Sequence, residues 1–137
     1  MYNIFDISGS GMKAQSTRLT TTASNMSNAD VVSGSDQAPY SPNYPIVKPE
    51  SVNSGQNTLI DTPGVEVSAI YQSNQPPIQR YQPSHPLAND EGYVYLPNVN
   101  MVEEMTNMMS ASKGYRMNVE VLTTAKELMA RTLQMGE

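Results

Sequence analysis

Few residues in this chain could support catalysis. It contains one histidine, His85, and no cysteine, so a His/Cys zinc site and a Cys-His nucleophilic pair are both excluded. Ser84 and Asp90 lie near His85 in a proline-rich segment, but that segment lacks the nucleophile turn and oxyanion hole that a Ser-His-Asp triad needs. We therefore expect a structural role for His85, with no catalytic residue, no metal site and no cofactor.

Two pairs of neighbouring carboxylates remain, Asp90-Glu91 and Glu103-Glu104. Adjacent side chains on a helix point in different directions. Glu103 also stands three residues after Asn100, which is the spacing of a helix capping box. We expect solvated charges at both pairs and no acid-base chemistry.

Composition indicates a chain that is short of apolar core. The 137 residues, 15.0 kDa, suit one compact domain or a helical unit with a small insert. Leu, Ile, Val and Phe together make up less than a fifth of the sequence, close to the border of disorder. Only 15% of the residues are charged, so the chain does not resemble a disordered polyelectrolyte. We expect it to complete its core with neighbouring molecules.

Charge and hydropathy exclude several partners. The net charge of −5 and the pI near 4.7 leave no basic cluster to neutralise phosphates, so we expect no nucleic-acid binding. No stretch approaches 18 apolar residues, so we expect no membrane insertion. Polar residues such as Asp6 and Lys13 interrupt the first thirty residues, so we also expect no cleavable signal peptide.

Proline placement divides the chain into three parts. All ten prolines lie between Pro39 and Pro97, so long helices are allowed only at the two ends. We expect an N-terminal helix in residues 1–30, a Pro/Tyr-rich middle with loops and short β-strands in 31–98, and a C-terminal helix in 99–137. The predicted fold class is mainly α, with the two long helices in a coiled-coil or helical-bundle arrangement.

The C-terminal segment has a heptad pattern. Asn100 can cap its first turn and Gly136 ends the periodic stretch. Apolar residues occupy eight of the ten seam positions, which are Met101, Met105, Met108, Ser112, Tyr115, Val119, Leu122, Lys126, Met129 and Leu133. A second stripe contains Val121, Leu128 and Met135. Two apolar faces indicate more than one neighbour, and the alternative is that both line the core of a monomeric bundle.

The N-terminal segment predicts a second helix, from about Ile4 to Asn28. Its seam residues are seven apart and are Phe5, Met12, Leu19 and Met26. Gly9, Gly11 and many Ser and Thr residues have modest to poor helix propensity, so packing must hold this helix. The alternative is a helix that is interrupted near Gly9 to Gly11.

The middle predicts a few strands. Residues 65–71 alternate in polarity after a Thr-Pro-Gly turn, and residues 92–96 form a second strand candidate that ends at Pro97. Residues 33–62 are polar and proline-rich, and we expect an extended or partly mobile excursion there.

Several segments carry a family resemblance. NIFDISGSGM at 3–12, AQS at 14–16, RL at 18–19 and ASNMSNAD at 23–30 resemble the N-terminal signature of the bacterial flagellar rod and hook axial proteins. HPLA at 85–88, GYV at 92–94, PNVN at 97–100, SAS at 110–112 and NVEVL at 118–122 resemble the proximal rod subunit of that family in particular.

The resemblance implies a structural subunit of the flagellar basal body. Such a subunit is exported through the flagellar type III apparatus without a cleavable signal peptide. It assembles in the periplasm with copies of itself and with other rod subunits, and it transmits torque as part of a drive shaft. Whether the terminal helices pair within or between subunits is left open.

The candidate subunit-interface residues are the apolar positions of the stripes. They are Phe5, Met12, Leu19, Met26, Met101, Met105, Met108, Tyr115, Val119, Val121, Leu122, Leu128, Met129 and Leu133. An alternative function is a small periplasmic module that binds cell-wall glycan, with the helices as a dimerisation stalk. Its stacking residues would be Tyr71, Tyr81, Tyr93 and Tyr95.

Overall fold

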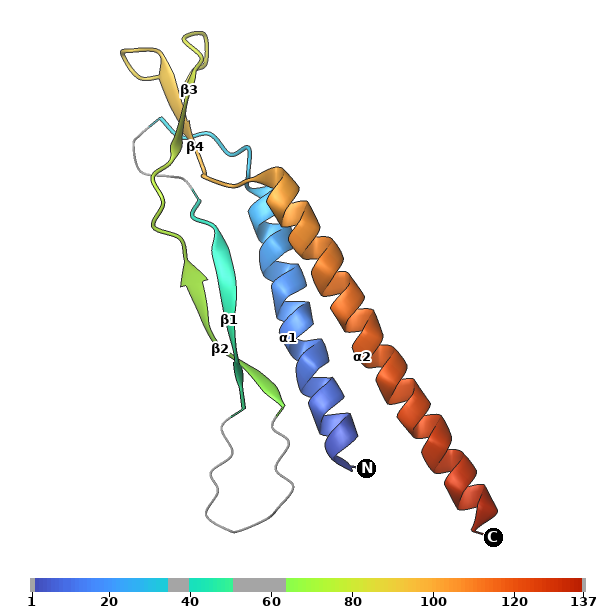
Figure 1. The fold of residues 1–137 in the computed structure, drawn as a ribbon. Helices are drawn as coiled ribbons and strands as arrows, with labels where there is room; N and C mark the ends of the chain where they lie inside the picture. The colour runs from blue at the N-terminus through green and yellow to red at the C-terminus, as the bar shows by residue number, and fades with distance from the viewer. Residues whose placement is uncertain (1, 35–39, 51–63, 137) are drawn as a thin grey trace.

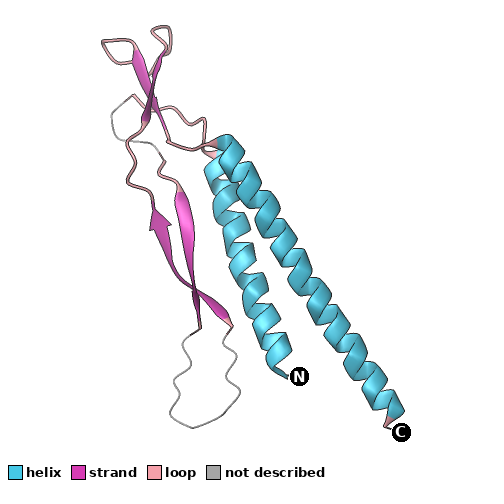
Figure 2. Cartoon of the chain, in the orientation of Figure 1, coloured by secondary structure: helices cyan, strands magenta, loops and turns pink. Residues whose placement is uncertain are grey.

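The computed structural model describes residues 2–34, 40–50 and 64–136. These residues form two helices, α1 (Tyr2–Ser27) and α2 (Met101–Met135), and four strands between them in the sequence. The helices run antiparallel and side by side, with both chain ends at the same end of the pair (Figure 1). The strands form two separate antiparallel hairpins (Figure 2). The expected mainly helical fold with short strands in the middle is therefore confirmed.

Helix α2 begins and ends where its capping residues predict. The Asn100 side chain accepts hydrogen bonds from the backbone N–H groups of Val102 and Glu103, at 3.1 and 3.4 Å. At the other end, the Gly136 N–H donates to the carbonyls of Thr132 and Leu133. These bonds satisfy backbone groups that a helix end otherwise leaves unpaired.

Helix α1 continues through Gly9 and Gly11 without a break, so the predicted alternative of an interruption is wrong. The reason is packing against α2. A Cβ atom added at Gly11 would lie 2.9 Å from the Asn118 side chain, and one added at Gly114 would lie 3.1 Å from Gln15. Glycine at these two positions lets the helices approach closely, which offsets its low helix propensity.

The contacts between the helices define their register. Asn25 lies opposite Glu104, Gln15 opposite Gly114 and Gly11 opposite Asn118. Moving by a given number of residues toward the N-terminus of α1 corresponds to moving by the same number toward the C-terminus of α2. We call this line of contact the helix seam, and in α2 it follows residues spaced by seven, namely Glu104, Ala111, Asn118 and Ala125. The seam is therefore built from small and polar side chains.

Strands β1 (Asn43–Pro49) and β2 (Val65–Gln72) form the hairpin that lies along α1. The register runs from Asn43 opposite Gln72 to Pro49 opposite Val65, with an irregularity between Ile46 and Val47. The predicted strand 65–71 is confirmed, whereas β1 was not predicted. Proline is tolerated in β1 because a two-stranded sheet consists of edges only. The excursion predicted over 33–62 is described only in part, since 35–39 and 51–63 lie outside the described residues.

Strands β3 (Ile78–Tyr81) and β4 (Tyr93–Leu96) form the second hairpin, beyond the end of the helix pair (Figure 1). The predicted strand 92–96 is confirmed and begins one residue later. Val94 and Leu96 are buried, and the Tyr81 and Tyr93 rings pack edge to face with centroids 5.3 Å apart. Gly92 precedes β4 with a φ of +84°, a backbone conformation that L side chains rarely adopt.

We expect opposite effects from alanine at two glycines. Gly92→Ala should destabilise the β3–β4 hairpin by roughly 1–2 kcal/mol, because positive φ strains an L residue, and its Cβ would lie 2.9 Å from the Tyr81 ring. Gly9→Ala is the matched control, since an added Cβ there has no atom within 4 Å, and it should stabilise α1 by about 0.5–1 kcal/mol. Hydrogen exchange at Val94 and urea unfolding measure the two effects. Equal changes in both variants would contradict this account.

Candidate subunit interface

A buried polar cluster joins β1 to both helices. The Asn25 side chain is fully buried, and its amide nitrogen donates to the Asn43 carbonyl at 3.0 Å and to the Glu104 carboxylate at 3.3 Å. Its amide oxygen accepts from the Asn43 N–H at 2.9 Å and from the Tyr40 hydroxyl at 2.7 Å. One side chain thus fixes the position of β1 relative to α1 and α2.

Glu104 is the acidic member of this cluster and is only 1% exposed. The prediction of solvated charge at Glu103-Glu104 is therefore wrong for Glu104. Hydrogen bonds from Asn25 and from the Tyr44 hydroxyl offset the cost of burying its carboxylate. It also lies in the first turn of α2, where the helix dipole favours a negative charge. Burial and the Glu104 charge raise the pKa of Tyr44 to about 12.

Sequence reasoning missed this cluster because it searched for apolar periodicity. The signal was present in the spacing of seven from Glu104 to Ala125, where alanine alternates with a polar residue. A polar side chain at a seam position of paired helices is a known way to specify register. The polar atoms of the cluster hydrogen-bond to one another, so the cluster has a structural role in the fold.

The large apolar side chains lie outside the helix seam. The predicted α1 stripe, Phe5, Met12, Leu19 and Met26, is half-buried. Three residues of the predicted α2 stripe are also half-buried, namely Met108, Leu122 and Met129. The others are exposed, from 38% to 72% of their surface, and are Met101, Met105, Tyr115, Val119 and Leu133. The predicted stripes therefore do not form the contact between α1 and α2.

The predicted α1 stripe and the first predicted α2 stripe, which begins at Met101, lie on the same side of the helix pair. Met12 and Val119 each follow a seam residue by one position, and Leu122 follows one by four. In two antiparallel helices, positions at these offsets project to the same side of the pair. The β1–β2 hairpin covers the opposite side, where Ser10, which precedes a seam residue, accepts a hydrogen bond from the Val65 N–H at 3.1 Å.

We call this side the outer face. Its apolar members are Phe5, Met12, Leu19 and Met26 of α1 and Met101, Met105, Met108, Tyr115, Val119, Leu122 and Met129 of α2. Large single-sided apolar surfaces mark interaction sites in soluble proteins.

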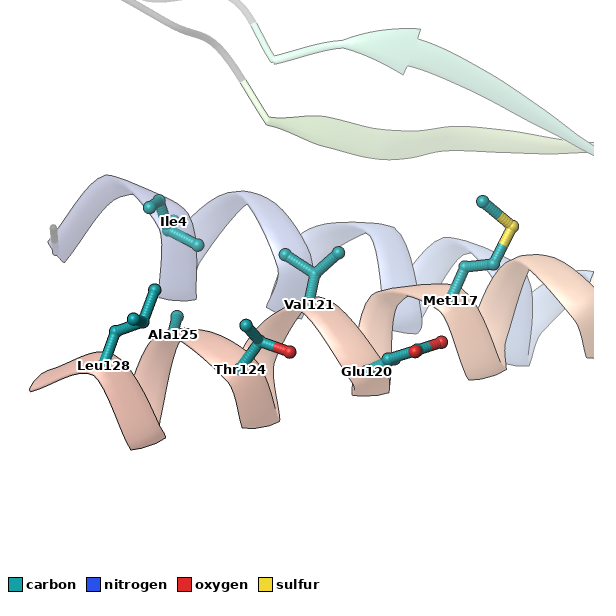
Figure 3. A pocket seen from close by; sticks show the side chains of 7 residues that line it. All are labelled: Ile4, Met117, Glu120, Val121, Thr124, Ala125 and Leu128. Carbon is teal, nitrogen blue, oxygen red and sulfur yellow. The ribbon is translucent and has the colours of Figure 1, made fainter. Parts of the chain in front are cut away.

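A second apolar surface is a groove of about 460 Å³ on the hairpin side of the helix pair. Ile4 of α1 and the second predicted stripe, Val121 and Leu128 of α2, line it (Figure 3). Met117, Glu120, Thr124 and Ala125 complete the lining. The structure thus separates the predicted interface residues, apart from Leu133, into two surfaces on different sides of the molecule.

The remaining sequence candidates belong to local structure. The His85 ring nitrogen Nδ1 accepts a hydrogen bond from the Leu87 N–H at 3.1 Å, within the turn between β3 and β4. Among the described residues, no group of three His, Asp or Glu side chains is placed to hold a metal ion. No helix in the described ranges is long and apolar enough to cross a membrane.

Asn25→Ala should destabilise the protein by about 2 kcal/mol or more, because it leaves buried polar groups without partners. The N–H and carbonyl of Asn43 lose their side-chain bonds, so hydrogen exchange at Asn43 should accelerate together with a loss of thermal stability. Asn28→Ala is the control, since the Asn28 side chain, among the described residues, donates hydrogen bonds to Ser24 and Ser27 at the end of its own helix. An Asn25 variant as stable as the Asn28 variant would contradict the role of the cluster.

The raised Tyr44 pKa predicts a loss of stability at alkaline pH. The folded value is about 12 against 10.0 for the free side chain, so the stabilising contribution is fully present below pH 10 and decreases as pH rises toward 12. Tyr44→Phe should remove this part of the decrease in urea-unfolding free energy. Tyr71→Phe, at the partner position on β2, should retain it. A pH profile unchanged by Tyr44→Phe would contradict the assignment.

Comparison with known proteins identifies the family. Residues 5–34 match the family described as flagella basal body rod protein, and residues 90–135 match the family described as flagellar basal body rod FlgEFG protein C-terminal. The chain is 45% identical to the flagellar basal-body rod protein FlgC of Escherichia coli O6:H1 and 44% identical to that of Salmonella typhimurium. It is 46% identical to FlgC of Yersinia enterocolitica. Each of the three alignments covers 100% of this chain and 98% of the relative.

The two segments that match rod families contain α2 and most of α1, the helices that carry the partly exposed apolar faces. The identity to the three relatives extends over the full length of the chain. The chain belongs to the FlgC family of flagellar basal-body rod proteins.

Proposed function

We propose that this rod protein polymerises through its terminal helices and transmits torque as part of the proximal rod. Family membership makes the chain a structural component of the flagellar basal body and not an enzyme. The observation that carries the polymerisation proposal is the pair of apolar surfaces, the outer face and the groove, that the isolated chain covers only in part.

The small apolar core of the isolated chain supports this proposal. In the described residues, the buried hydrophobic side chains are Ala14, Val94, Leu96, Ala111 and Ala125. Three of these five are alanines, so the isolated chain gains little from apolar burial. Moving a large apolar side chain from full exposure to full burial contributes roughly 1.5–3 kcal/mol, and a half-buried side chain contributes only part of this. Assembly therefore supplies the stability that the single chain lacks.

The heptad spacing of the outer face suits helix packing between subunits. Side chains such as Met105, Leu122 and Met129 recur at coiled-coil intervals and can insert between residues of a neighbouring helix. The groove lies on a different side and has a different shape, so contacts between subunits join unlike surfaces. Such head-to-tail contacts produce an open helical tube when the rotation does not close.

The proposal includes the route and the partners expected from the sequence. The subunit passes through the flagellar type III export apparatus without a cleavable signal peptide. It assembles in the periplasm with copies of itself and other rod subunits. The chain has three parts in this proposal, an N-terminal helix in 1–30, a middle in 31–98 and a C-terminal helix in 99–137. The polar helix seam supports this route, because a weakly stabilised helix pair can unfold for export at low cost.

The glycan-binding alternative is not favoured. Relatives that match the chain over its full length are rod proteins. The candidate tyrosines also do not gather on one surface, since Tyr71 lies in the β1–β2 hairpin while Tyr81 and Tyr93 pack against each other in the second hairpin.

We expect Leu122→Asp and Val119→Asp to block rod assembly while export continues, because each places a charge in an apolar contact between subunits. Val119 is 39% exposed in the single chain, so its variant should fold normally and separates assembly from folding. Thr106→Asp, at an exposed position of α2 that is rotated away from the outer face, is the control.

The measurements are swimming motility and the amounts of subunit in isolated basal bodies and in the periplasmic fraction. The variants are expressed in a flagellated species from which its own copy of the gene has been deleted. Loss of motility with normal export is expected for the two outer-face variants. Normal motility in both would refute assembly through this face.

A further inference from the structure

The groove beside Ile4 contains a charged side chain in an otherwise largely apolar lining, and this combination indicates what binds there. Its lining is apolar apart from Thr124 and one charged residue, Glu120. Figure 3 shows Ile4 of α1 and Leu128 of α2 approaching each other at one end of the groove and Met117 at the other. A helix with an apolar face and a single basic residue would match this lining in shape and charge.

The last turns of α2 have these properties. The seam register pairs Gly11 with Asn118 and brings Ile4 beside Ala125, so α2 continues past the first turn of α1 (Figure 1). We call residues 129–135 the α2 tip. Leu133 and Met135 in the tip are 72% and 83% exposed, so the chain itself covers little of their surface.

Charge and helical spacing select one face of the tip. Arg131 is the single charged residue among 129–135, and Met135 stands four residues after it. Residues four apart lie on the same face of a helix. This face therefore presents one large apolar side chain and one cation, whereas the groove presents apolar walls and one carboxylate.

We propose that the groove of one copy binds the α2 tip of a second copy, with Met135 between the apolar walls and Arg131 paired with Glu120. This inference rests on the proposed function and adds a specific contact to it. We place the tip of each copy in the groove of the next copy and not in a reciprocal pair, so the contact is heterologous and leaves one tip and one groove free at the ends of an array. It propagates along the rod and does not close a dimer.

Cysteine trapping tests the contact, because the chain has no cysteine of its own. Two differently tagged variants, Val121→Cys and Met135→Cys, are expressed together in a flagellated species from which its own copy of the gene has been deleted. The cells are then treated with an oxidant. We expect a disulfide-linked heterodimer in the basal bodies. Val102→Cys is the matched control, since Val102 is 72% exposed in the first turn of α2, and it should trap Val121→Cys at least about tenfold less.

Three outcomes would overturn the inference. Equal trapping by Met135→Cys and Val102→Cys would show a contact without specificity, and a dominant Val121→Cys homodimer would show that grooves face each other. Assembled rods with no Val121-to-Met135 trapping would overturn the contact and leave the proposed function standing. If the parent chain does not enter rods at all, both fail.

A charge exchange gives an independent test. Glu120→Arg and Arg131→Glu should each lower the amount of subunit in basal bodies, by about tenfold, and the double variant should recover to within about twofold of the parent. Each single change also places like charges four residues apart, Arg116 with Arg at 120 or Glu127 with Glu at 131. Those local penalties persist in the double variant, so recovery reports the pairing between copies. Losses that simply add would contradict the proposal.

Discussion

The close approach of α1 and α2 is the constraint on which the rest of the structure depends. Gly11 meets the Asn118 side chain, Gly114 meets Gln15, and Ala111 is fully buried between the helices. A seam this narrow has no room for methionine or leucine. The large apolar side chains are therefore displaced to the flanks, where the isolated chain covers them only in part. The close approach of the helices accounts for both the small apolar core of the isolated chain and its large, partly exposed apolar surfaces.

Polar contacts give this narrow seam its specificity. Asn25 and Glu104 pair at one end, and Arg18 donates to the Asn107 side chain at 3.2 Å further along. Within the described residues, the buried Gln15 Oε1 has no hydrogen-bond partner, which is a cost to stability. We infer that the seam specifies register more than it contributes stability. This suits a subunit of a family whose members act in an assembled rod.

Two surfaces on opposite sides of one helix pair explain how a small chain can serve as a mechanical part. In the proposed assembly a neighbouring subunit covers each of the two surfaces, and the Asn25–Glu104 cluster fixes β1 relative to both helices. Load that enters one surface can pass through the packed helices to the other. Rigidity of this kind requires close packing and fixed hydrogen bonds and no reactive group, in agreement with the absence of a catalytic motif in the sequence.

The sequence by itself determined the elements at the ends of this protein. Proline confined long helices to the termini, and Asn100 and Gly136 bounded α2. Alternating polarity located β2, and the run that ends at Pro97 located β4, because these signals act over a few neighbouring residues. Tertiary structure decided which helix faces meet. The heptad pattern predicts contact along the most apolar line of each helix, whereas the helices meet along a line of small and polar side chains, where glycine and alanine allow close approach. It also decided that Glu104 is buried and that proline-containing β1 is a strand, because both depend on partners distant in sequence.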